Sequence, residues 1–339
     1  METNYLREGE IKEVADGLGR LKAALERVLF GQEAVVEQVV VGMLARGHVL
    51  LEGLPGLGKT ELVKGLARAT GLQTRRIQFT PDLLPGDVTG TPVLVEDGNG
   101  RRLVFQPGPL FAQLVLADEI NRASPKTQSA LLEAMQERQV TVMGETRMLP
   151  EPFFVLATQN PVELEGTYPL PEAQVDRFLF KVDVRLDSVE VLERIVLERE
   201  MGIPPEVEAV TDAAGVAAAC EMARRVFMPR PVAAYIARLV HGTQPGGPVS
   251  REDLRFGASP RAALALAAAS KARALLYGRI NAGFEDVKAL ASAVLRHRLV
   301  LDYRARVAGR TADQIVAELL TSVSVDGSGV PQTLREARL

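Results

Sequence analysis

The sequence predicts a layered α/β domain with a parallel core sheet, followed by an all-helical domain. Up to about residue 186, short apolar runs alternate with helical patterns, which is typical of strand–helix–strand units. A glycine-rich loop at residues 53–60 joins one such run to a helical pattern, as in a P-loop fold. After residue 187 the strand-like runs end and helical periodicity continues.

The expected strands of the parallel sheet are short and almost continuously apolar, as strands covered on both faces should be. They lie at residues 48–52, 75–79, 114–118, 153–157 and 179–184. Two further β-prone pairs flank turn signals at residues 96–100 and 144–146. We expect these pairs to form hairpins that stand apart from the sheet.

The second half of the chain shows helical stretches separated by proline- and glycine-containing loops. The stretches lie near residues 188–200, 212–226, 231–241, 259–277, 283–299 and 311–322. We therefore expect an α/β domain at residues 1–186, a helical domain at 187–323 and a C-terminal tail at 324–339.

Composition indicates an ordinary globular protein, with 47% hydrophobic and 24% charged residues. The formal net charge of -3 argues against a surface built to hold nucleic acid. A single cysteine, Cys220, excludes an intrachain disulfide and a cysteine zinc site. The charged N-terminal residues lack the apolar core of a signal peptide, and no apolar run reaches the length of a membrane span. We expect a cytoplasmic protein.

Residues 53–60 read GLPGLGKT, a complete phosphate-loop pattern between a strand-like run and a helical pattern. Glycines there let backbone N–H groups converge on a triphosphate. Lys59 is expected to reach the β- and γ-phosphates, and the Thr60 hydroxyl to ligate Mg²⁺. The sequence thus predicts binding of ATP and Mg²⁺. The expected contact residues are Gly53, Leu54, Pro55, Gly56, Leu57, Gly58, Lys59, Thr60 and Glu61.

Two adjacent carboxylates follow the apolar run at residues 114–117. A buried strand would deliver Asp118 and Glu119 beside the phosphate loop, at the sheet edge where such folds bind ligands. Asp118 would hold Mg²⁺, and Glu119 would orient and deprotonate the attacking water. Such a pair taken alone is as consistent with a solvated strand end, but its combination with the phosphate loop favours catalysis.

Two further polar residues are candidates for the same site. Asn160 follows the run at residues 153–157, where an amide would hydrogen-bond the γ-phosphate or the lytic water. Its alternative role is that of a turn opener before Pro161. Arg177 could stabilise charge on the γ-phosphate, including that of a neighbouring subunit. The alternative for Arg177 is an intrachain ion pair with Asp176 or Glu172.

Arg261 follows Ser259 and Pro260, which together predict the start of a helix. From there it could reach the nucleotide from the helical domain and couple hydrolysis to domain rotation. The alternative is a solvated arginine in the first turn, which gains nothing from the helix dipole.

Together these motifs resemble those of AAA+ ATPases, and more narrowly the MoxR family. The most specific stretches are residues 76–85, reading RIQFTPDLLP, residues 117–128, reading ADEINRASPKTQ, and residues 157–161, reading ATQNP. The resemblance spans roughly residues 14–323. It implies an AAA+ domain followed by an all-α lid domain.

The resemblance also implies roles for individual residues. Asn160 matches sensor 1, Arg177 an arginine finger acting in trans, and Arg261 sensor 2 acting in cis. Residues 81–113 match the helix-2 insert and residues 139–150 the pre-sensor 1 hairpin, both of which would face the pore of a ring. The segment expected to run past the adenine comprises Gly31 and Gln32, with Val28 and Leu29 offering apolar contact.

MoxR-type proteins are similar to remodelling chaperones, so the resemblance implies a hexameric ATPase that assembles or activates a partner protein complex. A von Willebrand factor A domain protein is the implied partner. The loop at residues 85–90 has no aromatic residue to grip a chain, which argues against processive threading. Two alternatives remain open, a slow nucleotide-gated binding module and a metal-chelatase-type motor subunit. The negative net charge disfavours a motor that acts on nucleic acid.

Overall fold

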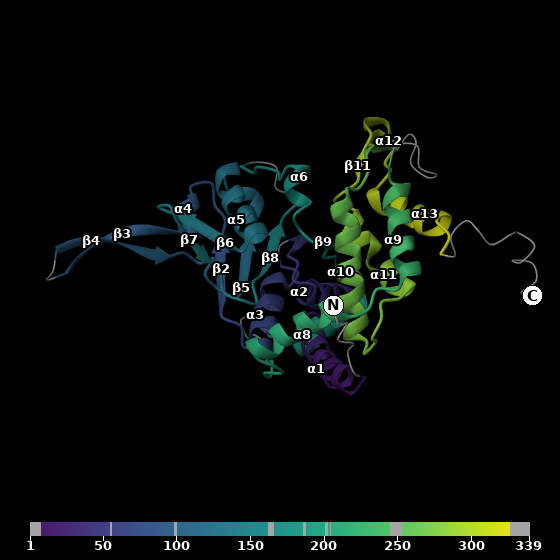
Figure 1. Cartoon of the computed structure of the whole chain (residues 1–339), viewed down its shortest axis with the longest axis horizontal. Coiled ribbons are helices and arrows are strands. Elements are labelled where there is room, and N and C mark those ends of the chain that lie inside the picture. The colour runs from purple at the N-terminus through teal and green to yellow at the C-terminus, as the bar shows by residue number, and fades with distance from the viewer. Residues whose placement is uncertain are drawn as a thin grey trace, which may run out of the picture. The chain divides into compact units, whose positions relative to one another are not determined.

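The computed structural model describes residues 8–54, 56–97, 100–161, 166–185, 188–200, 203, 205–244 and 253–325. Pro55, predicted to contact phosphate, lies outside these residues. The chain forms two compact units, Gly17–Cys220 and a second made of Met1–Asp16 with Glu221–Leu339 (Figure 1). This division differs from the boundary expected at residue 186. Helix α7 (Val189–Glu198) follows residue 186 and still belongs to the Gly17–Cys220 unit, where it packs closely on Gly31.

The Gly17–Cys220 unit is built on a five-stranded sheet in the order β2-β5-β8-β1-β9. The strands are β1 (Val49–Glu52), β2 (Thr74–Gln78), β5 (Leu114–Asp118), β8 (Phe154–Gln159) and β9 (Phe180–Asp183). Every pairing is parallel, which confirms the predicted sheet. The carboxyl ends of the strands therefore meet at one edge.

Burial explains why these runs form the sheet. The adjacent residues Leu114 and Val115 in β5, and Val155 and Leu156 in β8, point to opposite faces of the sheet and all have exposed fractions of 0%. Apolar side chains on both faces of a strand require helices on both sides, as in α/β folds. The register pairs Gln78 with Asp118 and Ala117 with Ala157, so polar residues begin together at the strand ends.

The helices of this unit begin and end at recognisable caps. α3 (Lys59–Thr70) lies between Gly58 and Gly71, both left-handed, and α5 (Pro125–Glu137) begins after Ser124, whose hydroxyl accepts from the Thr127 amide. The other helices of this unit are α2 (Glu33–Leu44), α4 (Pro85–Thr89), η1 (Ile120–Arg122) and α6 (Glu172–Val175). Two helices, α1 (Glu8–Glu26) and α8 (Ala213–Arg225), have residues in both units.

Both predicted hairpins are present and separate from the parallel sheet. β3 (Gly90–Asp97) pairs with β4 (Gly100–Pro107), and the ribbon extends away from the sheet in Figure 1. β6 (Gln139–Val142) pairs with β7 (Glu145–Met148) through a turn in which Met143 and Gly144 have φ of 55° and 77°. Two consecutive positive φ values match the twist of a hairpin and favour glycine.

The second unit is helical, with one correction. It contains α9 (Arg230–Gly242), α10 (Pro260–Leu276), α11 (Phe284–Leu295), α12 (Tyr303–Val307) and α13 (Ala312–Ser322). It also contains a two-stranded antiparallel sheet of β10 (Leu254–Phe256) and β11 (Val300–Leu301), which the all-helical prediction missed. Strands of three and two residues are too short to show a period. Within the described part of the chain, no helix is long and apolar enough to span a membrane.

His48, just before β1, is a buried polar residue that ties the sheet to α5. Its Nδ1 accepts the Val155 amide at 3.0 Å, so Nε2 carries the proton and donates to the Met135 carbonyl at 3.1 Å. Burial lowers the pKa of His48 from 6.5 to about 4. The hydrogen bond from Val155 requires the neutral ring, because protonating Nδ1 removes its acceptor, whereas the bond to Met135 persists in either form.

We predict that His48 makes the fold acid-sensitive. Its folded pKa lies below its unfolded pKa, so its contribution to stability is complete above pH 6.5 and is lost as the pH falls towards 4. The loss amounts to about 3 kcal/mol of unfolding free energy. His48→Gln should be less stable than wild type at pH 7 but should lose less stability between pH 6.5 and 4, as measured by urea unfolding.

The exposed His241 in α9 offers a control, since His241→Gln should leave the unfolding free energy at pH 7 within about 0.5 kcal/mol of wild type. Equal acid sensitivity of wild type and His48→Gln would contradict the assignment.

Candidate active site

A cavity of about 300 Å³ lies in the Gly17–Cys220 unit, where β5, β8 and the start of α3 meet. Its walls come from the phosphate loop and from the ends of two neighbouring strands. The lining residues are Gly56, Gly58, Lys59, Thr60, Glu61, Asp118, Glu119, Thr158 and Asn160. Three separate predicted motifs therefore contribute to one cavity.

The phosphate loop has the backbone that its glycines predict. Gly56 and Gly58 have φ of 85° and 78°, in the left-handed region that side chains disfavour. A Cβ on Gly53 would lie 2.5 Å from the carbonyl oxygen of Val184. Lys59, Thr60 and Glu61 form the first turn of α3 and line the cavity, so the unpaired N–H groups of a 12-residue helix face it. This arrangement favours an anion.

Lys59 is the cation of the cavity. Its Nζ donates to the Gly53 carbonyl. Burial lowers its pKa, and the nearby carboxylates, chiefly those of Asp118 and Glu119, oppose that effect. A partly desolvated ammonium beside unpaired helix N–H groups is suited to bind phosphate oxygens.

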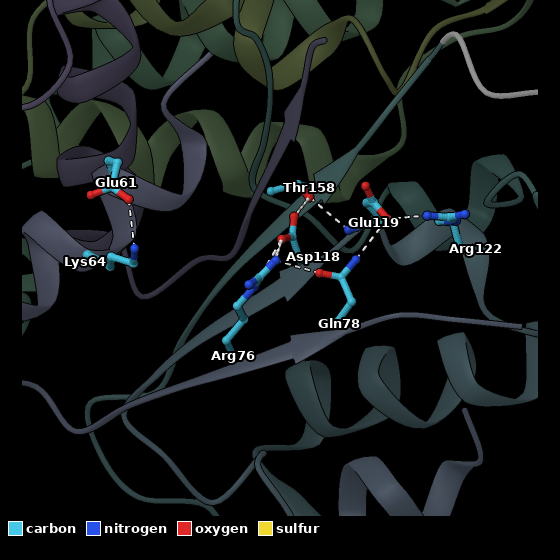
Figure 2. A network of polar contacts seen from close by, with 8 residues as sticks. All are labelled: Glu61, Lys64, Arg76, Gln78, Asp118, Glu119, Arg122 and Thr158. Carbon is cyan, nitrogen blue, oxygen red and sulfur yellow. Dashed lines mark hydrogen bonds and ion pairs between the residues drawn. The ribbon is translucent and has the colours of Figure 1, made fainter. Parts of the chain in front are cut away.

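Asp118 ends β5 and is held by two neighbours (Figure 2). The Thr158 hydroxyl donates to Oδ1 at 2.6 Å, and the Arg76 guanidinium donates to Oδ2 from Nη2 at 2.7 Å and from Nε at 3.2 Å. The Asp118 side chain is only 13% exposed. Its orientation is therefore fixed from the two strands that flank β5.

Glu119 turns the chain away from the sheet. Its φ is 56°, a left-handed value that is unfavourable for a residue with a side chain and is found at functional sites. The amide of Glu119 donates to the Thr158 hydroxyl at 2.9 Å. Its Oε2 accepts from Gln78 and from Arg122, each at 2.9 Å, as Figure 2 shows.

Asn160 lines the cavity and is 7% exposed. The Nδ2 of Asn121 donates to the Asn160 carbonyl at 3.4 Å, and Asn121 is itself buried. The segment after β8 is thus tied to the segment after β5. Asn160 thus belongs to the wall of the cavity, and its predicted contact with the γ-phosphate or the water stays a prediction.

The two predicted arginines do not line this cavity. Arg177 follows α6, and its Nη1 donates to the Leu132 carbonyl in α5 at 3.0 Å. Arg261 is exposed in the first turn of α10, in the other compact unit. That helix begins at Pro260 after Ser259, as predicted, although the Ser259 side chain makes no cap hydrogen bond.

A second cavity, of about 700 Å³, shares Gly56, Gly58 and Glu61 with the first and has a largely apolar lining. The remaining lining residues are Val28, Leu29, Phe30, Gln32, Leu57, Lys64, Leu192, Ile195, Arg199, Glu200, Ile203 and Pro205. An apolar compartment beside an anion site has the features expected of a pocket for the base of a nucleotide.

The segment predicted to run past the adenine lies at this second cavity. Val28, Leu29 and Gln32 line it, and the Gln32 amide donates to the Arg185 carbonyl. Gly31 has a φ of 67° and lies against α7. Leu54 lines neither cavity and is 51% exposed, so its predicted contact with phosphate stays a prediction.

The prediction from sequence missed four residues that orient the carboxylates: Thr158, Arg76, Gln78 and Arg122. A signal was available for two of them. β2 reads Thr-Arg-Arg-Ile-Gln, and Arg76 and Gln78 share one face of a strand in an otherwise apolar sheet. Polar residues at that spacing indicate a polar partner on the neighbouring strand.

The cavity also suits a magnesium ion. Thr60 and Asp118 place a hydroxyl and a carboxylate on its walls, both hard oxygen donors. No group of three or more His, Cys, Asp or Glu side chains suited to a metal occurs among the described residues. A site with few protein ligands matches Mg²⁺ bound through carboxylate, hydroxyl and substrate phosphates.

Comparisons with known proteins agree with this geometry. Residues 48–180 match the family model of the ATPase family associated with various cellular activities (AAA), and residues 249–319 match the AAA lid domain. A crystal structure of a candidate ATPase from Cytophaga hutchinsonii is 38% identical with a TM-score of 0.85, covering 94% of this chain and 97% of that one.

Three curated relatives extend over nearly the whole chain. Chaperone MoxR1 of Mycobacterium tuberculosis is 43% identical over 94% of this chain and 85% of its own length. The protein YeaC of Bacillus subtilis, which is uncharacterised, is 43% identical over 91% of this chain and 94% of its own length. Protein MoxR of Methylorubrum extorquens is 31% identical over 94% of this chain and 98% of its own length. The chain belongs to the MoxR family of AAA+ ATPases.

Proposed function

We propose that this protein hydrolyses ATP with Mg²⁺ at sites completed by a second copy of the chain, and uses the energy to remodel, assemble or activate a partner protein complex. The observation that supports hydrolysis is the meeting of Lys59, Asp118 and Glu119 in one cavity with the first turn of α3. The chaperone name of a 43% identical relative supports work on a protein.

Each residue of the cavity has a distinct task in this proposal. The N–H groups of the phosphate loop and Lys59 bind the triphosphate. Thr60 and Asp118 hold Mg²⁺, which when bound neutralises charge on the phosphates. Glu119 takes a proton from the attacking water, with Gln78 and Arg122 holding its Oε2 and leaving Oε1 for that proton. Asn160 orients the γ-phosphate or the water.

The arginine finger is assigned in trans. Arg177 does not line the cavity of its own chain and is anchored on the Leu132 carbonyl. In this proposal the guanidinium serves the site of an adjoining copy, where it would stabilise charge on the γ-phosphate. A hexameric ring is the assembly that the family implies, with Arg261 acting as sensor 2 within its own chain.

The partner and setting follow from the family resemblance. We infer a partner with a von Willebrand factor A domain and a cytoplasmic location. The slow nucleotide-gated module remains the second candidate. One observation favours it: Gln78 and Arg122 both donate to Oε2 of Glu119, so a partner that shifts either contact would change where this carboxylate points and thereby the rate of hydrolysis.

The proposal predicts that binding and hydrolysis can be separated. Glu119→Gln keeps the shape of the side chain but cannot take a proton, so the phosphate release rate should fall by about 10²- to 10⁴-fold while ADP affinity is retained. Lys59→Ala should lose both hydrolysis and ADP affinity, because this cation binds the phosphates. A phosphate-release assay measures hydrolysis, and a calorimetric titration measures ADP affinity.

The matched control is Glu133→Gln, which alters an exposed carboxylate of α5 and should hydrolyse ATP at the wild-type rate. Wild-type hydrolysis by Glu119→Gln would exclude this residue as the base.

A second prediction concerns Thr158, which is 1% exposed. Thr158→Val removes the donor to Asp118 and the acceptor of the Glu119 amide while keeping the volume. We expect the Mg²⁺ concentration for half-maximal ATPase rate to rise and the maximal rate to fall by about 10- to 100-fold, because both carboxylates lose their orientation. Titration of the rate with Mg²⁺ measures both quantities.

Thr158→Ser retains the hydroxyl and should restore both quantities to near wild type. If Thr158→Val kept the wild-type Mg²⁺ dependence, the hydroxyl would have no part in orienting Asp118.

A further inference from the structure

Helix α7 forms one wall of the larger, apolar cavity. Leu192 and Ile195 of α7 line that cavity, and so does Arg199, which caps the carboxyl end of the helix. None of the α7 residues is buried. A helix without buried side chains gains little from the hydrophobic effect, so its position depends on the few specific contacts that it makes.

Those contacts converge on the segment at residues 27–31. A Cβ on Gly31 would lie 2.2 Å from Cγ2 of Val191, so the backbone of this segment and α7 approach closely only because residue 31 is glycine. The guanidinium of Arg199 donates to the Arg27 carbonyl and, at 3.1 Å, to the Val28 carbonyl. It also lies 4.5 Å from the ring centre of Phe30.

Arg199 therefore makes three contacts of two kinds with residues 27–30. Its two hydrogen bonds are assisted by charge, and a planar guanidinium can donate in the plane while its face stacks on an aromatic ring. The acceptors and the ring belong to Arg27, Val28 and Phe30, two of which line the cavity. Moving Arg199 would therefore change the cavity wall both at α7 and at residues 28–30.

Arg194 provides an internal comparison. It also places its guanidinium over Phe30, at 4.1 Å from the ring centre. Unlike Arg199, it does not line the cavity, its side chain is 51% exposed, and it forms an ion pair with Glu198 at 2.9 Å. The two arginines share the aromatic contact and differ in the carbonyl hydrogen bonds.

We propose that Arg199 is a positioning residue that holds α7 over the base of the bound nucleotide. This inference rests on the proposed function, because it takes the apolar cavity as the base pocket. The residue acts on the base side alone, since it does not line the phosphate cavity. Affinity for a ligand with a base depends on Arg199, and affinity for a bare polyphosphate does not.

The test compares ADP with inorganic tripolyphosphate in calorimetric titrations of the full chain with Mg²⁺. We expect Arg199→Ala to weaken ADP binding by about tenfold and to leave tripolyphosphate binding within about twofold of wild type. Arg194→Ala should leave both affinities within about twofold, because the carbonyl hydrogen bonds remain. Thermal unfolding establishes that each variant is folded.

Arg199→Lys is the second variant, in case Arg199→Ala does not fold. Both carbonyl hydrogen bonds leave from Nη2, but a lysine ammonium has no planar face to stack on Phe30 at the same time, so ADP binding should again weaken while tripolyphosphate binding is kept. Wild-type affinity for ADP in a folded Arg199 variant would overturn the proposal, as would equal losses for ADP and tripolyphosphate. If wild-type protein bound neither ligand, the proposed function itself would fail, which is a distinguishable result.

Discussion

The Thr158 hydroxyl donates a 2.6 Å hydrogen bond to Asp118 and accepts a 2.9 Å hydrogen bond from the Glu119 amide. A hydroxyl has a single proton, so giving it to Asp118 leaves only acceptor capacity for the amide. One buried group thereby sets the direction of one carboxylate and the backbone turn that presents the next. The left-handed φ of Glu119 persists because this hydrogen bond and the start of η1 over-determine the turn.

Charge balance completes this arrangement. The carboxylates of Asp118 and Glu119 each have a guanidinium beside them, from Arg76 and Arg122, and Lys59 lies in the same cavity. Arg76 and Arg122 are 55% and 42% exposed, so these ion pairs contribute little to stability. Their effect is to orient the carboxylates of Asp118 and Glu119. A triphosphate brings further negative charge, which the N-terminus of α3 and Lys59 are placed to receive.

The sequence was sufficient to predict the parallel sheet and the phosphate loop, because β1, β5 and β8 are short, mainly apolar runs and the loop is a contiguous motif. It was not sufficient for Thr158 and Arg76, because their partners are set by strand register, which places Gln78 opposite Asp118 and Ala117 opposite Ala157. The β10–β11 pair was missed because strands of three and two residues have no measurable period.

The place of α7 was not predictable for a different reason. Its apolar residues remain largely exposed, with Val189, Val196 and Leu197 at 74%, 77% and 77%, so the pattern that normally indicates a buried face does not identify its neighbours. Its contacts include hydrogen bonds from Arg199 to backbone carbonyls. Every residue has a backbone carbonyl, so the sequence does not indicate which carbonyls accept these bonds. The role of Arg261 stays a prediction from the family pattern.

The most direct test of a catalytic site shared between copies is the ATPase rate per subunit as a function of protein concentration, for wild type and for Arg177→Ala. We predict a rate that rises with concentration in the wild type and collapses in the variant, because each site needs the arginine of another copy. A rate per subunit that is independent of concentration and survives Arg177→Ala would contradict the shared site.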